Sequence, residues 1–171
     1  MKEQTGKVTM KGNPLTVLGE ELKVGDKAPD VVFVNGSMEE KHLKDLLGNV
    51  LIISSVPSLD TPVCDIETKR FSKEVDALGG DVEVLTVSMD LPFAQKRWCG
   101  AEGVENVKVF SDHKYASFGE KFGVLIKELR LLARVVFVLD REGVIRHIDW
   151  VKEVGEEPDY DRVMEAAKGL L

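Results

Sequence analysis

Two cysteines offer the most reactive chemistry in this sequence. Cys64 ends the segment SVPSLDTPVC, which covers residues 55–64 and follows a run of apolar residues, and Cys99 is the second cysteine. A cysteine acts as a nucleophile or a metal ligand through its thiolate, or forms half of a disulfide, and the residues around it decide among these roles. Pro57 and Pro62 stand on either side of a polar turn, so Cys64 follows a change in backbone direction.

The residues just before Cys64 predict the start of a helix. Thr61 is a favourable N-cap residue and Pro62 suits the first helical position, so Cys64 falls at the third position, N3. The unpaired amides and the helix dipole there favour an anion, and hence the thiolate over the thiol. Asp65 and Glu67 are negative and oppose this effect, so we expect a cation from elsewhere in the fold. A buried, unreactive cysteine is the alternative.

The overall composition is that of an ordinary globular protein. The 171 residues are 43% hydrophobic and 31% charged, which suits a single domain spanning residues 1–171. The formal charge is −7 with no basic cluster, which argues against nucleic acid or an anionic membrane as partner. The polar amino terminus lacks a signal-peptide pattern and no apolar stretch is long enough to span a bilayer, so we expect a cytoplasmic protein.

A cytoplasmic location limits what the sulfur can do. In a reducing compartment a lone cysteine pair is seldom a permanent disulfide. The histidines show no ligand spacing with one another or with the cysteines, so the sequence predicts no metal site. These histidines are His42, His113 and His147.

Hydrophobic periodicity predicts strands that alternate with helices. Residues 7–19 predict an amino-terminal hairpin around a Gly-Asn-Pro turn, and residues 134–151 predict a second hairpin. The capping-box spacing of Ser37 and Glu40 predicts a short helix over residues 37–48. Further strands are expected in residues 31–34, 49–56, 82–89 and 107–110, and further helices in residues 61–78, 91–99, 114–123 and 159–171.

This alternation predicts one three-layer α/β domain with a thioredoxin-like core and an added amino-terminal β-hairpin. The apolar run in residues 49–56 is continuous, which is typical of a parallel strand buried on both faces. This strand leads into the turn before Cys64, and open α/β sheets keep their sites at the carboxyl ends of such strands.

Pro57, Thr61 and Cys64 form the pattern Pro-x-x-x-Thr-x-x-Cys. The pattern resembles the active-site signature of the peroxiredoxins. Longer segments resemble one subgroup, the bacterial thiol peroxidases, which are also called atypical two-cysteine peroxiredoxins. They are MKGNPLTVLG, VGDKAPD, SVPSLDTPVCDIETKRF, SMDLPFAQKRWCGAEG, LLARVVFVLD and EEPDY, in this order. The resemblance covers nearly the whole chain.

The resemblance implies roles for five residues. Cys64 matches the peroxidatic cysteine, which attacks the peroxide O–O bond and becomes a sulfenic acid. Thr61 matches the residue whose hydroxyl forms hydrogen bonds with the thiolate and the peroxide. Pro57 matches the residue that shields the pocket from water. Arg134 matches the arginine beside the thiolate, which is the cation that the local pattern lacks. Cys99 matches the resolving cysteine, which forms a disulfide with Cys64 in the same chain.

The resemblance also implies partners. We expect a peroxide as substrate, thioredoxin as reductant and a homodimer, with no metal or organic cofactor. Two segments depart from the family pattern: the loop before Arg134 carries Lys127 and Arg130, and residues 30–35 lack the usual aromatic pattern. Both departures leave the pocket shape and the preferred peroxide open.

Other functions stay open from the residues alone. A non-catalytic module would use Cys64 and Cys99 as a structural disulfide, which stabilises by about 4 kcal/mol in the chain-entropy model. A thiol–disulfide oxidoreductase is less favoured, because the sequence has no Cys-x-x-Cys motif. Without the resemblance, Arg134 fits a surface position and Cys99 a core position.

Overall fold

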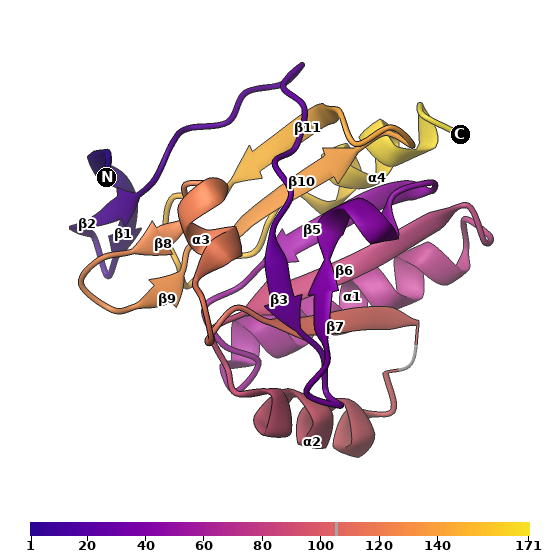
Figure 1. Cartoon of the computed structure of the whole chain (residues 1–171), viewed down its shortest axis with the longest axis horizontal. Coiled ribbons are helices and arrows are strands. Elements are labelled where there is room, and N and C mark those ends of the chain that lie inside the picture. Colours follow the sequence, from indigo (N-terminus) through magenta and orange to yellow (C-terminus); the bar gives the residue numbers. More distant parts are fainter. Residues whose placement is uncertain (105) are drawn as a thin grey trace.

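The chain forms a central β-sheet with helices on both faces and a small second sheet at one end (Figure 1). The computed structural model describes residues 1–104 and 106–171. The strands are β1 (Glu3–Met10), β2 (Asn13–Leu18), β3 (Val32–Val34), β4 (Glu40–His42), β5 (Val50–Ser55), β6 (Val82–Ser88), β7 (Val107–Ser111), β8 (Leu125–Ile126), β9 (Leu131–Leu132), β10 (Val135–Leu139) and β11 (Ile145–Trp150). The helices are η1 (Leu43–Leu46, a 3₁₀-helix), α1 (Pro62–Asp76), α2 (Pro92–Glu102), α3 (Ser117–Lys121) and α4 (Tyr160–Lys168).

The central sheet brings the two cysteine-bearing helices to one edge. Within the described residues its strand order is β11-β10-β5-β6-β7-β3-β4. The middle strands β5, β6 and β7 are parallel, and β10 runs antiparallel to β5. Parallel neighbours have their carboxyl ends at the same edge, so the segments that follow β5 and β6 emerge side by side. The first leads into α1 with Cys64 and the second into α2 with Cys99.

The strand β5 is buried on both faces, as its continuous apolar run predicts. Leu51 and Ile53 pack in one apolar cluster with side chains of α3, whereas Val50 and Ile52 pack in a second cluster with α1, α2 and α4. The alternation follows from the two-residue period of a strand. Figure 1 shows α1 and α4 on one side of the sheet and α3 on the other. The expected three-layer α/β arrangement is confirmed.

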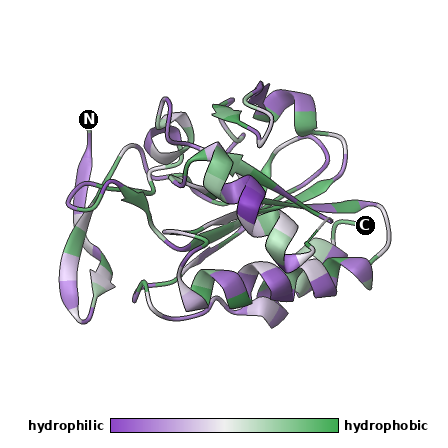
Figure 2. Cartoon of the chain, turned by 90° about the horizontal axis from the view of Figure 1, so that it is seen from below, coloured by the Kyte–Doolittle hydropathy of each residue, from purple (hydrophilic) through white to green (hydrophobic). Residues whose placement is uncertain are grey.

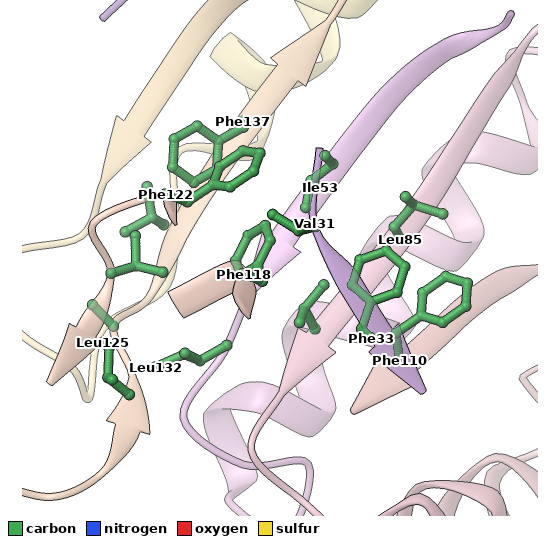
Figure 3. Packing of buried hydrophobic residues seen from close by; sticks show 14 of the residues in the cluster. Val31, Phe33, Ile53, Leu85, Phe110, Phe118, Phe122, Leu125, Leu132 and Phe137 are labelled. Atoms are coloured by element: carbon green, nitrogen blue, oxygen red, sulfur yellow. The ribbon is translucent and has the colours of Figure 1, made fainter. Parts of the chain in front are cut away.

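Phenylalanines fill the space between the sheet and α3 (Figure 3). Phe33 and Phe110 stack with ring centroids 4.3 Å apart, and Phe118 and Phe122 stack at 4.4 Å. Both rings of the second pair meet Phe137 of β10 edge to face. Aromatic pairs contribute beyond the area that they bury. This packing therefore fixes the position of β10, the strand beside β5.

The amino-terminal hairpin is confirmed, with β1 antiparallel to β2. Its turn is Lys11 and Gly12, not the expected Gly-Asn-Pro, because Asn13 and Pro14 already belong to β2. Both turn residues have positive φ, 52° and 80°, which matches a two-residue turn to the twist of its strands. The hairpin joins β8 and β9 in the small second sheet, which the sequence pattern did not predict.

The helix expected over residues 37–48 is wrong. The side-chain oxygen of Asn35 accepts from the backbone amides of Ser37 and Glu39, each at 3.0 Å, and so takes the donors that a helix cap would hold. Met38 has a φ of 64°, in the left-handed region that a helix excludes. The segment continues as β4, which pairs with β3, and then as η1.

The remaining expected elements are present, including the hairpin of β10 and β11 and the helix α4 near the carboxyl end. Figure 2 shows that the central strands are mostly hydrophobic and that hydrophobic and hydrophilic residues alternate along the helices. None of the helices in the described part of the chain is long and apolar enough to cross a membrane.

Candidate active site

The first turn of α1 has the predicted capping geometry. Thr61 is the N-cap, Pro62 is the first helical residue and Cys64 is the third. The Thr61 hydroxyl accepts from the Cys64 amide at 3.3 Å and donates to the carbonyl of Ser58 at 2.9 Å. The Cys64 side chain is wholly buried. The turn after β5 therefore holds the thiol at the amino end of a capped helix, where backbone amides and the helix dipole favour an anion.

Arg134 lies beside this turn because of strand pairing. It immediately precedes β10, in which Val135 pairs with Ser55, the last residue of β5. The Ser55 hydroxyl also donates to the carbonyl of Ala133 at 2.7 Å. These contacts place Arg134 next to the chain that leads from β5 to Cys64. The residue is only 1% exposed, so the alternative of a surface arginine is wrong.

Arg134 forms a buried ion pair with Glu67. Its Nη1 lies 3.0 Å from the Glu67 Oε2, and its Nε and Nη2 donate to the carbonyl of Val154 at 3.1 and 2.8 Å. Glu67 lies three residues after Cys64 on α1, so both side chains share one helix face. The ion pair thus brings the Arg134 guanidinium to the face of α1 that carries Cys64.

The environment of Glu67 is unusual for a carboxyl group. Its side chain has no exposed surface, and its Oε1 has no hydrogen-bond partner among the described residues. Burial raises the pKa of Glu67 to about 7, against the opposing pull of Arg134. The local sequence pattern shows Glu67 only as a negative neighbour of Cys64. No local signal identifies its partner, which is 67 residues away along the chain.

A cavity of about 200 Å³ opens onto these residues. Pro57, Thr61 and Arg134 line it, together with Val63, which directly precedes Cys64. The rest of the lining is mainly apolar and includes residues of the small sheet and of the loop between β8 and β9. Among these residues are Met10, Ile126, Leu129 and Leu131. The structure therefore gathers three of the five expected site residues around one space and buries Cys64 next to it.

Cys99 lies on α2, apart from this group. It is partly buried against the apolar cluster that contains Phe71 and Trp98, and burial raises the pKa of its thiol. Both Cys64 and Cys99 are free thiols. The fifth expected site residue thus occupies the neighbouring helix and not the cavity.

Side chains link α2 to α1 close to both cysteines. The Trp98 indole donates to the Asp65 carboxylate at 2.9 Å. Lys69 lies 3.0 Å from Asp65 and 2.6 Å from Glu102, and so bridges the two helices. The Trp98–Asp65 bond and the Lys69–Glu102 ion pair thus join residues close to Cys64 in the sequence to residues close to Cys99.

Among residues 1–104 and 106–171, no cluster of three or more His, Cys, Asp or Glu side chains is arranged to hold a metal ion.

Comparison with known proteins agrees with this arrangement. The Redoxin family model matches residues 23–164. A "Thiol peroxidase" of Bacillus subtilis is 55% identical over 164 residues, which cover 96% of this chain and 98% of the relative. A "Thiol peroxidase" of Listeria innocua is 52% identical over 161 residues, 94% of this chain and 97% of the relative. The chain belongs to the redoxin family and, within it, to the thiol peroxidases.

Solved structures support the same fold. A peroxiredoxin-like protein from Aquifex aeolicus superposes with a TM-score of 0.90 at 46% identity, covering 98% of this chain and 99% of the other. A thiol peroxidase from Chromobacterium violaceum has a TM-score of 0.86 at 17% identity, covers 95% of each chain and shows the fold alone. The predicted thioredoxin-like fold with an amino-terminal hairpin is confirmed.

Proposed function

We propose that this chain is a thiol-dependent peroxidase that reduces hydrogen peroxide and organic hydroperoxides through Cys64. The observation that carries the proposal is the position of Cys64 at N3 of a capped helix, next to a cavity lined by Pro57, Thr61 and Arg134. Its membership of the thiol peroxidases supports the same activity.

The first step is attack by the Cys64 thiolate on one peroxide oxygen. An S–O bond forms as the O–O bond breaks, so the sulfur is oxidised to a sulfenic acid. The leaving oxygen takes up a proton and departs as water or as an alcohol. An anionic nucleophile and donors aimed at the developing charge are what this reaction needs.

Three side chains around the cavity assist this step. The Thr61 hydroxyl donates a hydrogen bond to the Ser58 carbonyl and accepts one from the Cys64 amide. Its second lone pair is therefore available to accept a hydrogen bond from the hydroperoxide O–H. Arg134 supplies positive charge, which favours the thiolate and the developing oxyanion. Pro57 is buried and covers the site without adding a competing donor.

In the second step Cys99 resolves the sulfenic acid. Its thiol attacks the sulfenic sulfur of Cys64, an intramolecular disulfide forms, and water leaves. A thioredoxin-type dithiol then reduces this disulfide by exchange and completes the cycle. We place the enzyme in the cytoplasm, where such dithiols are kept reduced.

The cavity favours substrates with an apolar substituent. Its lining is mainly aliphatic, and Leu129 and Met10 are partly exposed beside it. Apolar contact with an alkyl chain stabilises a bound organic hydroperoxide, whereas hydrogen peroxide offers no such surface. We therefore expect a lower KM for alkyl hydroperoxides than for hydrogen peroxide.

We also propose a homodimer, as expected from the resemblance. Leu91 and Phe93, at the start of α2, are 48% and 67% exposed although both are large and apolar. Exposed apolar groups of this size are typical of contact surfaces. Sedimentation velocity of the reduced protein measures the oligomeric state directly.

Replacement of each cysteine tests the cycle. Cys64→Ser removes the nucleophile, so we expect peroxide consumption with a thioredoxin system to fall to the level without enzyme. Cys99→Ser keeps the first step, and this variant should consume one equivalent of peroxide per chain and then stop. Full turnover in Cys64→Ser would exclude the proposed nucleophile, and full turnover in Cys99→Ser would exclude the proposed resolving thiol.

A further inference from the structure

The carboxylate of Asp90 connects the turn before Cys64 to the start of the helix that carries Cys99. Asp90 lies between the end of β6 and the start of α2. Its Oδ1 accepts from the Ser58 hydroxyl at 2.7 Å, and its Oδ2 accepts from the Leu59 amide at 2.8 Å and the Ser88 hydroxyl at 2.7 Å. Hydrogen bonds to a carboxylate are among the stronger ones in proteins.

The parallel sheet explains why these groups meet. Ser55 at the end of β5 is in register with Val87 of β6, and the Val56 amide donates to the Val87 carbonyl at 3.0 Å. Both strands then end at the same edge, so the segments after them run together. Ser58 and Asp90 occupy the two segments at this edge.

A continuous series of hydrogen bonds runs from Asp90 to Cys64. Asp90 holds the Ser58 side chain, and the Ser58 carbonyl accepts from both the hydroxyl and the amide of Thr61, at 2.9 and 3.2 Å. The Thr61 hydroxyl in turn accepts from the Cys64 amide. The orientation of the Thr61 lone pair that faces the cavity therefore depends on where Asp90 holds Ser58.

Asp90 is also linked to β7 and, through Ser88, to α2. The Asp90 carbonyl accepts from the Ser111 hydroxyl at 2.5 Å, and the Gln95 side chain of α2 donates to the Ser88 hydroxyl at 2.9 Å. Ser88 itself donates to Asp90. The first turn of α2 is thus attached to the network that holds the Cys64 turn.

We propose that Asp90 is a positioning residue that couples the two chemical steps. It holds the turn of residues 57–61 in the form that reacts with peroxide, and it holds the start of α2 so that Cys99 stays away from Cys64 until the sulfenic acid has formed. This inference rests on the proposed roles of Cys64 and Cys99. It assigns opposite effects of Asp90 to the two steps: faster reaction with peroxide and slower disulfide formation.

Asp90→Ala separates these effects. Loss of the Ser58 bond should slow the reaction of Cys64 with peroxide about tenfold, the rate equivalent of one hydrogen bond. Disulfide formation from the sulfenic acid should become several-fold faster in the same variant, because the start of α2 is released. Rapid quenching with a sulfenate-specific trap, followed by mass spectrometry, measures the two rates separately. Rates are normalised to titrated thiol.

Three further variants make the result specific. Ser58→Ala removes only one partner, and a double-mutant cycle with Asp90→Ala should show that their effects on the peroxide step do not add. Asp90→Asn keeps one acceptor oxygen and should lie between the parent and Asp90→Ala. Asp140→Ala removes another carboxylate that caps a turn, where it accepts from the amides of Glu142 and Val144. Asp140 follows Leu139, which pairs with the amino end of β5, so this control should change neither rate.

The outcomes are distinct. A slower peroxide step combined with faster disulfide formation, absent in Asp140→Ala, supports the proposal. Unchanged rates in Asp90→Ala, or equal losses in both steps, would overturn it and leave Asp90 a structural residue. If the parent protein forms a sulfenic acid but no intramolecular disulfide, the proposed role of Cys99 fails instead. If no sulfenic acid forms on Cys64, the proposed function fails.

Discussion

Arg134 lines the cavity and also forms an ion pair with Glu67, which lies on the same helix as Cys64. Arg134 and Glu67 are both buried and 3.0 Å apart. Removal of one member of such a pair leaves an uncompensated buried charge and costs about 3–5 kcal/mol. A single Arg134 variant therefore mixes a loss of stability with a loss of catalysis. Changing both partners separates the two effects.

The double variant Arg134→Ala/Glu67→Gln should react with peroxide about 100-fold more slowly than Glu67→Gln alone, because a donor to the developing oxyanion is lost. Stopped-flow measurements of peroxide consumption give the two rates. Equal rates for the two proteins would show that Arg134 does not act on the reacting groups.

Glu67 should also make stability depend on pH. Its pKa is raised to about 7 in the folded protein, mainly by burial, with Asp149 and Glu157 adding to the rise and Arg134 opposing it. A raised carboxyl pKa means that the folded state holds the proton more tightly than the unfolded state. The contribution of Glu67 is therefore complete below its unfolded pKa, near 4.5, and is lost as the pH rises through about 7.

The parent should thus lose stability relative to Glu67→Gln by up to about 3 kcal/mol between these limits. Urea unfolding of both proteins at several pH values measures the difference, and other titrating groups cancel in the comparison. A pH-independent difference would show that Glu67 keeps an ordinary pKa in the folded protein.

At the scale of elements, α1 and α2 differ in how firmly they are held. α1 has an N-cap bond from Thr61 and no glycine within its bounds. α2 has no side-chain bond at its N-cap, contains Gly100 and is followed by the C-cap residue Gly103, whose φ is 65°. A glycine inside a helix costs about 1 kcal/mol relative to alanine. Of the two cysteine-bearing helices, α2 should therefore yield first.

Formation of the disulfide should unravel residues 92–103. A disulfide needs Cα atoms within about 4.4 to 6.8 Å, whereas packed helices have axes about 8 to 10 Å apart. Amide hydrogen exchange should be faster across this segment in the oxidised protein than in the dithiol form, while α4 stays protected as an internal control. The Trp98 indole should lose its bond to Asp65, which changes the Trp98 fluorescence. Equal protection of residues 92–103 in both states would contradict this movement.

At the scale of the whole molecule, oxidation has two opposing effects on stability. The proposed disulfide between Cys64 and Cys99 would restrict the unfolded chain and stabilise the folded protein by about 4 kcal/mol in the chain-entropy model. Unravelling α2 removes the packing of Trp98 and the bonds of Lys69 to Asp65 and Glu102. A catalytic disulfide that unravels α2 therefore raises the free energy of unfolding by less than a structural disulfide does.

We expect the oxidised protein to gain clearly less than about 4 kcal/mol over the reduced protein. Urea denaturation midpoints of the two forms measure the change, and Cys99→Ser treated in the same way is the control that cannot form the bond. A gain of the full amount would favour the non-catalytic module with a structural disulfide.

The local features around Cys64 could be predicted from adjacent residues. The cap at Thr61, the proline after it and the N3 position of the thiol depend on adjacent residues, and all three are found in α1. The continuous apolar run of β5 likewise predicted burial on both faces. The resemblance added Arg134 as the missing cation, which no local pattern identifies.

The contacts between residues distant in the sequence could not be predicted in this way, because they depend on the fold of the whole chain. The capping-box pattern of residues 37–48 failed because pairing with β3 and the bonds of Asn35 outweighed a local helix preference. Glu67 and Arg134 are 67 residues apart, and Ser58 and Asp90 are 32 apart. Local periodicity carries no information on such contacts, because they depend on which strands are neighbours. The order of β10, β5 and β6 in the sheet brings these residues to the thiol.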